Sequence, residues 1–532
     1  MPSALPPGSA RPWMNWTRNL VHVPSPPGAS YMFAPRNLAE LRAVIAAANA
    51  AGVGVRVSGQ RHSQPPLVIN DNRGGLEPKP QVYLVDLSCY ADLGDDGAQR
   101  MVLDATGARL TVNAGVREDE IDAFLGAHDR MLRTVTAGGF FSVGGMTAVD
   151  VHGATVDAPI FAETASAFTL VGPDGAVTTI DATTPKIGDW SPLQFARVSL
   201  GGLGVVTSVT LDVLPRPYAN TLAPGNEAWH IDDEATFIST YKQVVKHNRV
   251  ESFYNPYADG ALDKAFLALW WDVDPNPTPP VPNTQVAVTS ACDLAKQQEY
   301  GAPYEGRVVE WFAEGAAEKA QYEDEPLLAS VITWAAVTDV RAQVKAAAAR
   351  YSDLWLGEAA RVMFMSYFVE LPDLDDAGLA VVWKGLQAVA SRVRQPGAFH
   401  VAAPMEFRFV RGGDSALAST WSKRPDSVFV NLDLIGFVDD GPASKYPDAL
   451  LQFFADVERD WVALGGFPHN GKMYGFYDPG AAAGTHTAPF NPAFLTALRA
   501  RRGDRVAAYE AYRKARDPKG LFRNAWLAAL LG

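Results

Sequence analysis

Apolar and polar residues in the first two hundred positions follow two alternating patterns. After Asn37, a residue type that caps helices, apolar residues recur at intervals of three and four as far as Gly52, which predicts a helix. Short apolar runs, which predict strands, and one further helical pattern come next. The predicted strands are 53–57, 82–87 and 109–114, and the second helix is 118–128. This alternation predicts an α/β or α+β unit.

The same alternation continues for about two hundred residues and then changes character. Two apolar runs flank the turn residues Pro173-Asp174-Gly175, which predicts a hairpin over 168–180, and a strand follows at 205–214. From about Tyr218 onward tryptophan and tyrosine residues cluster, and a proline-rich stretch interrupts the chain at 275–282. This change of composition predicts a domain boundary near Tyr218.

Helical and strand-like patterns mix in the second half of the chain. Helical spacing marks 338–351 and 377–392, and strand-like alternation marks 401–410 and 427–434. These elements predict a sheet covered by helices. The final segment, 494–531, returns to an Ala- and Arg-rich helical pattern that Asp517-Pro518 interrupts.

Length, charge and cysteine content narrow the possible classes of protein. A chain of 532 residues exceeds the size of one hydrophobic core, so two or more structural units are expected. The net charge of -13 repels phosphate backbones and anionic headgroups, which argues against nucleic acid as a partner. Cys89 and Cys292 lie far apart without metal-ligand neighbours, which predicts neither a disulfide framework nor a metal site. Redox chemistry would therefore require a cofactor.

Hydropathy along the chain predicts no membrane span. The sequence contains no run of about 18 apolar residues, the length that a membrane-spanning helix requires. Its first ten residues lack the charged-then-apolar order of a signal peptide. A soluble protein is expected, cytoplasmic as numbered or secreted if a leader peptide precedes this sequence. The sequence does not indicate an oligomeric state.

Three glycine-containing segments occur where the backbone could approach a ligand closely. The segment 58–63 follows a predicted strand, Gly144-Gly145 lies within 142–153, and 201–204 leads into the strand at 205–214. Each segment alone is typical of an ordinary turn or of tight strand packing. Together they could contact one extended cofactor. The glycine spacing of 58–63 matches neither a Walker phosphate loop nor the dinucleotide-binding GxGxxG.

The order of several motifs resembles the vanillyl-alcohol-oxidase family of flavoproteins, and the match spans both ends of the chain. The motifs are Pro35-Arg36-Asn37, Val55 to Ser63, Gly144-Gly145 to His152-Gly153, Gly201 to Thr207, and Asp517 to Phe522. The resemblance implies an α+β, two-domain flavoprotein with a split FAD-binding domain and a mixed sheet-and-helix substrate cap. It places the first part of the FAD-binding domain at 1–216, the cap at 217–485 and the completing C-terminal segment at 486–532.

The resemblance also implies which residues contact FAD. In many family members a histidine of the first glycine loop is bonded to the flavin, and His62 occupies the matching position. Covalent attachment through His62 is therefore expected, with a hydrogen-bonded loop histidine as the alternative. His152 is alternatively a core imidazole that closes its turn. The expected cofactor-binding residues are Ser58, Gly59, Gln60, Arg61, His62, Ser63, Ser142, Gly144, Gly145, Thr147, His152 and Val206.

One strand of the second half carries candidate catalytic side chains. In the stretch from Met405 to Phe409, the period of two puts Glu406 and Arg408 on one face and phenylalanines on the other. An exposed ion pair is the commoner fate of such residues. The apolar and aromatic neighbours instead favour a cavity, in which a carboxylate and a guanidinium would take part in chemistry.

A similar Glu-x-Arg strand occurs in the covalent-flavin cholesterol oxidases, a branch of this family with a large cap. The resemblance implies a second glutamate early in the cap, for which Glu251 is the match, and an active-site asparagine late in the cap, for which Asn470 is the match. His469 and Lys472 are rivals of Asn470. Each of these residues has a structural alternative as a surface or hydrogen-bonded polar side chain.

The resemblance implies an FAD-dependent alcohol oxidase as the first hypothesis. Glu406 or Glu251 would take the hydroxyl proton while hydride passes to flavin N5 and then to dioxygen, giving hydrogen peroxide. Arg408 would stabilise the alkoxide or keep the glutamate ionised. Aromatic residues of the predicted cap suit a small apolar alcohol such as the 3-hydroxysteroid cholesterol. These residues are Phe253, Tyr254, Trp270, Trp271, Trp311 and Trp334.

Two other hypotheses keep the same fold. The first is a polyol or aldonolactone oxidase or dehydrogenase, in which the Glu-x-Arg face would meet a hydrated, sugar-like substrate. The second is a non-catalytic binding protein, which an absence of the yellow flavin colour would favour.

Overall fold

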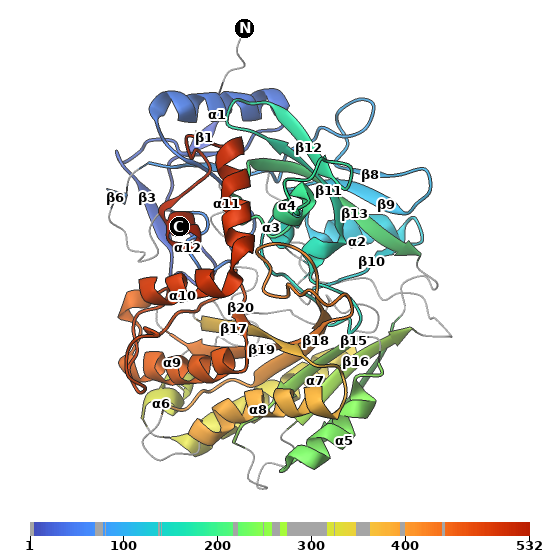
Figure 1. Ribbon diagram of the computed structural model, residues 1–532, viewed down its shortest axis with the longest axis vertical. Coiled ribbons are helices and arrows are strands. Elements are labelled where there is room, and N and C mark those ends of the chain that lie inside the picture. The colour runs from blue at the N-terminus through green and yellow to red at the C-terminus, as the bar shows by residue number, and fades with distance from the viewer. Residues whose placement is uncertain are drawn as a thin grey trace.

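In the computed structural model the protein has two parts, which form the upper and lower halves of Figure 1. The described residues are 5–69, 78–79, 81–136, 139, 141–215, 222–247, 249–257, 266–273, 316–323, 325–346, 362–393, 399–438 and 442–532. Figure 1 shows the N-terminal part and α11 in the upper half, and one large sheet with its helices in the lower half. This mixed helix-and-sheet, two-domain architecture confirms the predicted fold class.

A small sheet near the N-terminus forms where alternating elements were predicted. Its order is β1 (Gly8–Ser9), β4 (Met32–Phe33), β7 (Tyr83–Val85) and β5 (Val55–Val57), with the last three parallel. The apolar stripe of α1 (Leu38–Ala51) packs into the same core. The Asn37 side chain accepts a hydrogen bond from the Glu40 backbone at 3.0 Å, and Gly52 ends the helix in a left-handed conformation. The predicted helix is confirmed.

A second, antiparallel sheet follows. Its order is β12 (Val177–Asp181), β11 (Ala165–Val171), β13 (Val205–Pro215), β9 (Arg109–Asn113) and β8 (Met101–Leu103), with β10 (Arg130–Leu132) paired to β13. The predicted hairpin is confirmed as β11 and β12. The predicted helix at 118–128 is α2 (Glu118–Gly126). The glycine pair at 144–145, predicted only as a close-approach segment, lies in a short helix, α3 (Val143–Ala148).

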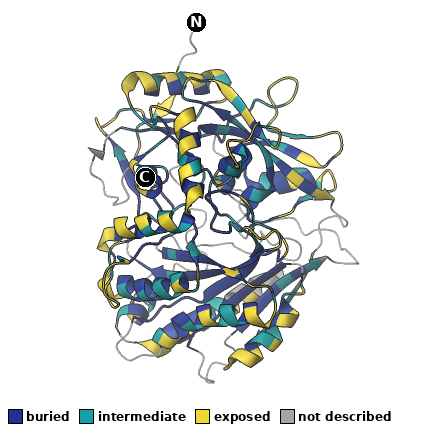
Figure 2. Cartoon of the chain, viewed as in Figure 1, coloured by how far each residue is buried: buried dark blue, intermediate teal, exposed yellow. Residues whose placement is uncertain are grey.

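The cap contains a seven-stranded antiparallel sheet. Its order is β14 (Leu222–Trp229), β16 (Phe266–Val273), β15 (Arg249–Tyr254), β18 (Met405–Arg411), β19 (Val428–Phe437), β17 (Val362–Leu371) and β20 (Phe467–Pro468). Helices α5 (Glu234–Val244), α8 (Asp376–Val393) and α9 (Asp448–Ala463) lie along the side of the sheet away from the upper half (Figure 1). The predicted sheet covered by helices is therefore confirmed. Figure 2 shows that the sheets are largely buried and that the helices expose their outward faces.

Element boundaries in the cap differ from the prediction in two places. The predicted strand 401–410 begins only at Met405, because Pro404 lacks the amide that would extend the ladder. The predicted helix 338–351 begins earlier, as α7 (Pro326–Ala346). Trp311 and the segments 275–282 and 347–351 lie outside the described residues.

The C-terminal segment returns to the N-terminal unit. It contains α10 (Pro492–Arg502), α11 (Asp504–Arg516) and α12 (Ala525–Leu531). Leu521 and Phe522 share a hydrophobic core with Leu41 of α1, and the Leu521 carbonyl accepts a hydrogen bond from Val55 of β5 at 2.8 Å. The two ends of the chain therefore stabilise one unit. The exact boundaries at 216 and 485 stay a prediction.

Arg56 holds these distant segments together. Its buried guanidinium donates to four backbone carbonyls, at distances between 2.6 and 3.0 Å. The acceptors are Leu67, Leu200, Gly201 and Phe522. Burial lowers the pKa of Arg56 to about 10, so the side chain stays charged at neutral pH. One cation thereby joins the first glycine segment, the third glycine segment and the C-terminus.

The expectation for Cys89 was incomplete. Cys89 takes part in a disulfide bond, whose other half lies outside the described residues. Residue spacing carried no signal for this pairing, because cysteines far apart in sequence can approach only through the fold.

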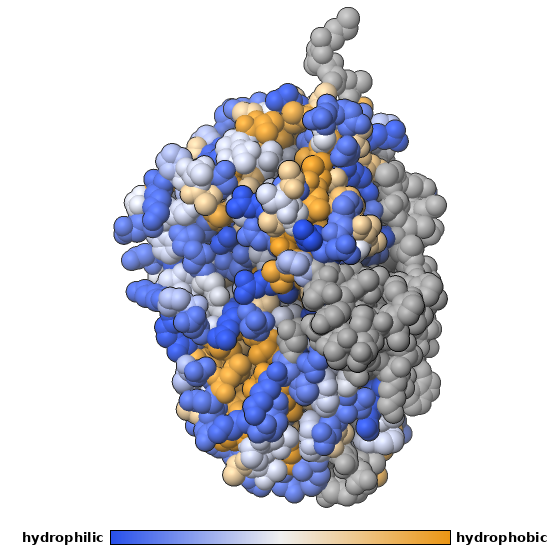
Figure 3. Space-filling view, turned by 90° about the vertical axis from the view of Figure 1, so that its right-hand side faces the viewer, coloured by the Kyte–Doolittle hydropathy of each residue, from blue (hydrophilic) through white to orange (hydrophobic). Residues whose placement is uncertain are grey.

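None of the helices that the structure describes is long and apolar enough to cross a membrane. Figure 3 shows one face on which hydrophilic side chains predominate and hydrophobic ones gather into patches.

Replacing Arg56 by lysine should destabilise the protein by about 3 kcal/mol, because an ammonium group cannot reach four carbonyls and leaves buried acceptors unsatisfied. Urea denaturation measures the loss. Arg109→Lys is the matched control, since Arg109 is 62% exposed in its ion pair with Asp212. Equal stability of the two variants would contradict the role given to Arg56.

Candidate active site

A pocket with a volume of about 350 Å³ is lined by residues of both halves of the molecule. All of the predicted cofactor-binding residues line it, from the segments 58–63 and 142–152 and from β13. Of the four predicted catalytic residues, Glu406 and Arg408 line it as well. The structure therefore brings together residues that lie more than 340 positions apart in sequence.

The first glycine segment enters the pocket directly after β5. Its entry is fixed by Ser58, whose amide donates to Val85 at 2.8 Å and whose hydroxyl accepts from the Trp13 indole at 2.8 Å. Gln64 at its far end donates to the Val362 carbonyl at 3.0 Å and accepts from the Phe364 amide at 3.1 Å. The segment is thus held between the N-terminal sheet and the cap strand β17.

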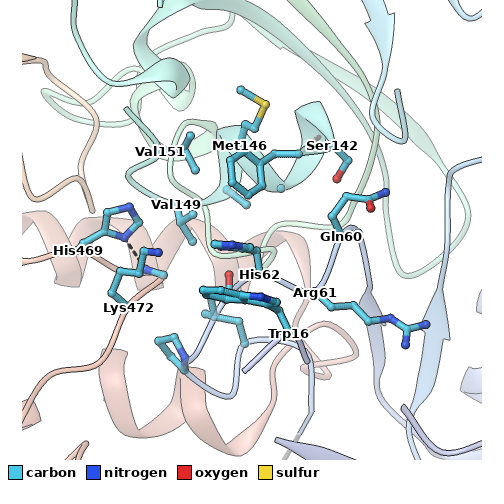
Figure 4. Close-up of a pocket in the computed structure, with 18 of the residues that line it drawn as sticks. Trp16, Gln60, Arg61, His62, Ser142, Met146, Val149, Val151, His469 and Lys472 are labelled. Atoms are coloured by element: carbon cyan, nitrogen blue, oxygen red, sulfur yellow. Dashed lines mark hydrogen bonds between the residues drawn. The ribbon is translucent and has the colours of Figure 1, made fainter. Parts of the chain in front are cut away.

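His62 is held between aromatic rings in this segment. Its imidazole stacks on Trp16 with 4.2 Å between ring centroids and 7° between planes, and it meets Phe141 edge-on at 4.8 Å. Figure 4 shows His62 over Trp16 inside the pocket, with the Arg61 side chain directed away from it. Two ring contacts restrict the imidazole to one orientation.

Glycines allow the backbone segments around the pocket to lie unusually close. A Cβ atom on Gly59 would lie 2.4 Å from the Ser142 hydroxyl, and one on Gly115 would lie 1.9 Å from the Leu87 carbonyl. Both glycines line the pocket. A cradle of closely spaced backbone fits an extended cofactor such as FAD, because it leaves main-chain groups accessible along its length.

The cap wall of the pocket carries a buried charge cluster. Arg408 Nη2 bonds to both Glu251 and Glu406, the latter at 2.9 Å, and Arg408 Nε donates to Glu251 at 3.0 Å. Cross-strand register explains the contact, because Glu251 on β15 stands directly opposite Arg408 on β18. Glu251 does not line the pocket and lies behind Arg408. The predicted Glu-x-Arg face therefore faces a cavity rather than solvent.

A further carboxyl group, Asp433, completes this cluster. It stands directly opposite Glu406 in the pairing of β18 with β19, lines the pocket and is 3% exposed. Burial raises the pKa of Glu406 well above its usual value, and the carboxyls of Glu251 and Asp433 add to this against the opposing effect of Arg408. Burial likewise raises the pKa of Asp433. In each case burial opposes ionisation of the carboxyl group, and the charge of Arg408 favours it.

Two histidines of the pocket wall are neutral. Burial, with Arg408 nearby, lowers the pKa of His152 to about 3. Burial also lowers the pKa of His469 well below its usual value. The Gly471 amide donates to His469 Nδ1 at 2.8 Å, which leaves the proton on Nε2 (Figure 4). His469 therefore keeps one ring N–H as a hydrogen-bond donor but cannot supply a positive charge.

Asn470 has a different environment from the one expected. It is not among the residues that line the pocket, whereas its rivals His469 and Lys472 are. Its amide donates to Asp150 at 2.6 Å and to Leu417 at 3.1 Å, and its carbonyl oxygen accepts from Arg502 at 2.9 Å. Both ends of the side chain are therefore engaged in a buried network behind the pocket wall.

Asp433 was missed at the sequence level, although the same signal that marked Glu406 and Arg408 was present. Asn431 and Asp433 alternate with apolar residues on a predicted strand, so period two puts them on one face. Trp16, which stacks on His62, had no comparable signal, because its contact depends on a fold between distant turns. Among the residues that the structure describes, no cluster of His, Cys, Asp and Glu could hold a metal ion.

Two protein families match different parts of the chain and together cover most of it. The family described as FAD binding domain matches residues 29–181, and the family described as D-arabinono-1,4-lactone oxidase matches residues 287–530. An L-gulonolactone oxidase of Bos taurus is 25% identical over 44% of this chain and 44% of its own length. A mitochondrial L-galactono-1,4-lactone dehydrogenase of Oryza sativa subsp. japonica is 31% identical over 30% and 25%. The chain thus matches less than half the length of either relative.

Solved structures resemble the whole chain. One described as a solvent-stable cholesterol oxidase superposes with a TM-score of 0.72 at 20% sequence identity, covering 100% of this chain and 99% of its own. Cholesterol oxidase from B. sterolicum gives 0.69 at 17% identity, covering 99% and 97%. At such identities the likeness establishes the fold alone.

Gly115→Ala should destabilise the protein by about 2 kcal/mol, because the new Cβ would overlap backbone atoms of Leu87 that cannot rotate away. Thermal unfolding and bound flavin per chain measure the effect. Gly54→Ala is the control, since its Cβ would meet only the Leu521 carbonyl at 3.4 Å. Normal flavin content and stability in Gly115→Ala would show that the backbone segments are not this close.

Proposed function

Because the chain belongs to the FAD-binding flavoproteins of the vanillyl-alcohol-oxidase type, we propose that it oxidises a secondary alcohol of a polyhydroxylated compound, with aldonolactones as the substrate class. It is an FAD-dependent oxidoreductase of the kind that acts on CH–OH groups. Oxidation of the carbinol requires an acceptor for hydride, and FAD supplies this chemistry when bound. The steroid hypothesis takes second place, because the named sequence relatives act on sugar lactones.

The observation that carries the proposal is the polar cluster on the cap wall. Glu406, Arg408 and Asp433 line the pocket together with His469 and Lys472. A single steroid hydroxyl can form hydrogen bonds with only one or two of these groups, and the apolar rings would exclude water from the others. A substrate with several hydroxyl groups satisfies more of them, which favours the polyol class.

Glu406 is the proposed base. Its carboxylate form accepts the hydroxyl proton as the carbonyl forms, and its raised pKa makes it a stronger base than an exposed glutamate. Arg408 contacts Glu406 at 2.9 Å and lines the same pocket, so it can stabilise negative charge that develops on the substrate oxygen. Glu251 acts through Arg408, which it holds in place from behind.

Residues of the glycine segments are proposed to hold FAD. The segment 58–63 and the segment 142–147 approach each other at Gly59 and Ser142, and both line the pocket. His62 is the proposed covalent attachment point, supported by its fixed position between Trp16 and Phe141. Dioxygen is proposed as the electron acceptor, in keeping with the relatives named oxidases.

A steroid substrate remains the second candidate for one specific reason. Toward one end of the pocket, the paired residues of β17 and β19 are apolar: Phe364 opposite Ile435, and Val362 opposite Phe437. This apolar wall would suit the rings of a steroid whose hydroxyl reaches Glu406. The polar and apolar walls thus favour different substrates, and turnover decides between them.

Steady-state peroxide formation on matched panels of aldonolactones, polyols and sterols tests the substrate class. The proposal expects a kcat/KM for the best aldonolactone at least 100-fold above that for any sterol, because the apolar substrate excludes water from the polar groups of the pocket without forming hydrogen bonds to them. Dye reduction measured in parallel separates oxidase from dehydrogenase activity. Turnover of sterols alone would overturn the lactone assignment and leave the oxidoreductase fold untouched.

Glu406→Gln should lower kcat by about 10²–10⁴-fold with little change in flavin content, because the amide cannot accept the hydroxyl proton. The control is Glu227→Gln on the exposed part of β14. A Glu406→Gln variant with wild-type kcat would remove Glu406 from the role of base.

Acid precipitation tests the covalent link. The wild-type pellet should stay yellow, whereas His62→Ala should release its flavin into the supernatant, because alanine lacks the imidazole to which the flavin is proposed to be bonded. His128→Ala is the control, since His128 is exposed and does not line the pocket. Wild-type protein that releases all of its flavin would contradict the attachment without affecting the proposed reaction.

A further inference from the structure

We propose that Glu406 and Asp433 share a single proton, so that the pair presents one hydrogen-bond acceptor and one donor to two neighbouring oxygens of the substrate. The sharing of the proton is a property of the protein itself. The recognition of two oxygens rests on the proposed function and makes Asp433 a specificity-determining residue for it.

Sheet register places Glu406 and Asp433 opposite each other on neighbouring strands. Glu406 is directly opposite Asp433, and Asp433 is directly opposite Ser366, so the three form one row across β18, β19 and β17. Directly opposed residues have Cβ atoms about 4.5–5.5 Å apart. All three residues line the pocket, so their side chains share the face of the sheet that looks into it.

The neighbouring row explains why Arg408 cannot neutralise both carboxyls. Two residues along each strand, Glu251, Arg408 and Asn431 form the adjacent row on the same face. Arg408 bonds to Glu251 through two nitrogens and to Glu406 through one. No direct ion pair joins Arg408 to Asp433 among the described contacts, so Arg408 opposes the rise in the pKa of Asp433 through its charge alone.

The balance of buried charges predicts that one of the carboxyl groups of this cluster keeps its proton. The carboxyls of Glu251, Glu406 and Asp433 face two cations, Arg408 and the more distant Lys472. With all three ionised the cluster would carry one excess negative charge inside the protein, which is costly in a low dielectric. His152 and His469 are neutral and cannot compensate. One retained proton balances the cluster.

The proton belongs to the pair Glu406 and Asp433 rather than to Glu251. Glu251 is fully buried and accepts hydrogen bonds from two nitrogens of Arg408, whereas Glu406 accepts from one. Burial and mutual repulsion instead oppose ionisation of Glu406. Asp433 Oδ1 is buried without a hydrogen-bond partner among the described residues, and the Asp433 side chain lines the pocket.

The shared proton defines what the site binds. The ionised member of the pair accepts the proton of the reacting hydroxyl. The O–H and C–H bonds of the substrate alcohol break, a C=O bond forms, and the C–H electron pair leaves as hydride to FAD. The protonated member donates a hydrogen bond to an oxygen on the adjacent carbon. After the step both carboxyls are protonated, and one proton returns to solvent before the next turnover. A vicinal hydroxyl pair matches this arrangement.

Infrared spectroscopy of the FAD-loaded protein tests the shared proton without turnover. Wild type should show the carbonyl stretch of one protonated carboxylic acid that is absent from Asp433→Asn. The same single band should be absent from Glu406→Gln and from the double variant, because a shared proton can be lost only once. Glu458, whose pKa burial raises to about 7, contributes equally to all four spectra and cancels in the differences. An unchanged band in Asp433→Asn, or two bands lost in the double variant, would overturn the sharing.

The pH profile of kcat/KM gives an independent readout. Asp433→Asn removes the neighbouring carboxyl, so the pKa of Glu406 falls and the acidic limb should move down by about one pH unit. The exposed Asp212→Asn is the control and should leave the profile in place. An acidic limb that stays fixed in Asp433→Asn would contradict the coupling.

Substrate pairs test the recognition of two oxygens. Wild type should prefer an aldonolactone over its analogue that lacks the hydroxyl next to the reacting carbon by at least 10-fold, and Asp433→Ala should abolish this preference. A preference that persists in Asp433→Ala overturns the recognition role. If no lactone is oxidised at all, the proposed function fails, and the infrared result still decides whether the proton is shared.

Discussion

The buried guanidinium of Arg408 is the interaction on which the site depends. A buried cation is stable only when anions surround it, and the surrounding carboxyls are in turn stable only because the cation is there. Glu251 and Glu406 reach Arg408 because β15 and β18 pair in one register. A slip of one residue would turn each of these side chains to the helix-covered face of the sheet. Charge balance and strand register therefore constrain each other.

Hydrogen bonds of residues that take no part in the proposed reaction connect this charged wall of the pocket to the glycine segments. Gln64 connects the first glycine segment to β17 by two hydrogen bonds. Asp150, just before His152, accepts hydrogen bonds from Ser419 and Asn470 of the cap. Burial raises the pKa of Asp150, while its donors and Arg502 oppose the rise. These bridges hold the glycine segments and the charged wall of the pocket together.

Much of the fold and part of the site follow from local patterns in the sequence. The helix after Asn37, the hairpin of β11 and β12, and the shared face of Glu406 and Arg408 each depend on neighbours within a few residues. The glycine segments were located from the sequence itself, the resemblance assigned them to FAD, and the structure gathers them in one pocket. Local pattern could not show that Asn470 faces Asp150 instead of the pocket, because that depends on contacts between residues 320 positions apart.

The position of Asp433 illustrates the limit most clearly. Its period-two pattern was readable, but its importance arises from strand order, which puts β19 between β18 and β17. Strand order is decided by the packing of the whole cap and leaves no local trace. Because they too depend on packing between distant segments, the disulfide of Cys89 and the stacking of Trp16 on His62 could not be predicted from the sequence.

Anaerobic mixing of the FAD-loaded protein with substrate tests the central claim most directly, because it isolates oxidation of the alcohol from the choice of electron acceptor. The account predicts that an aldonolactone bleaches the flavin absorbance rapidly in wild type and at least 100-fold more slowly in Glu406→Gln. Bleaching by a sterol but by no lactone, or equal rates in the two proteins, would contradict it.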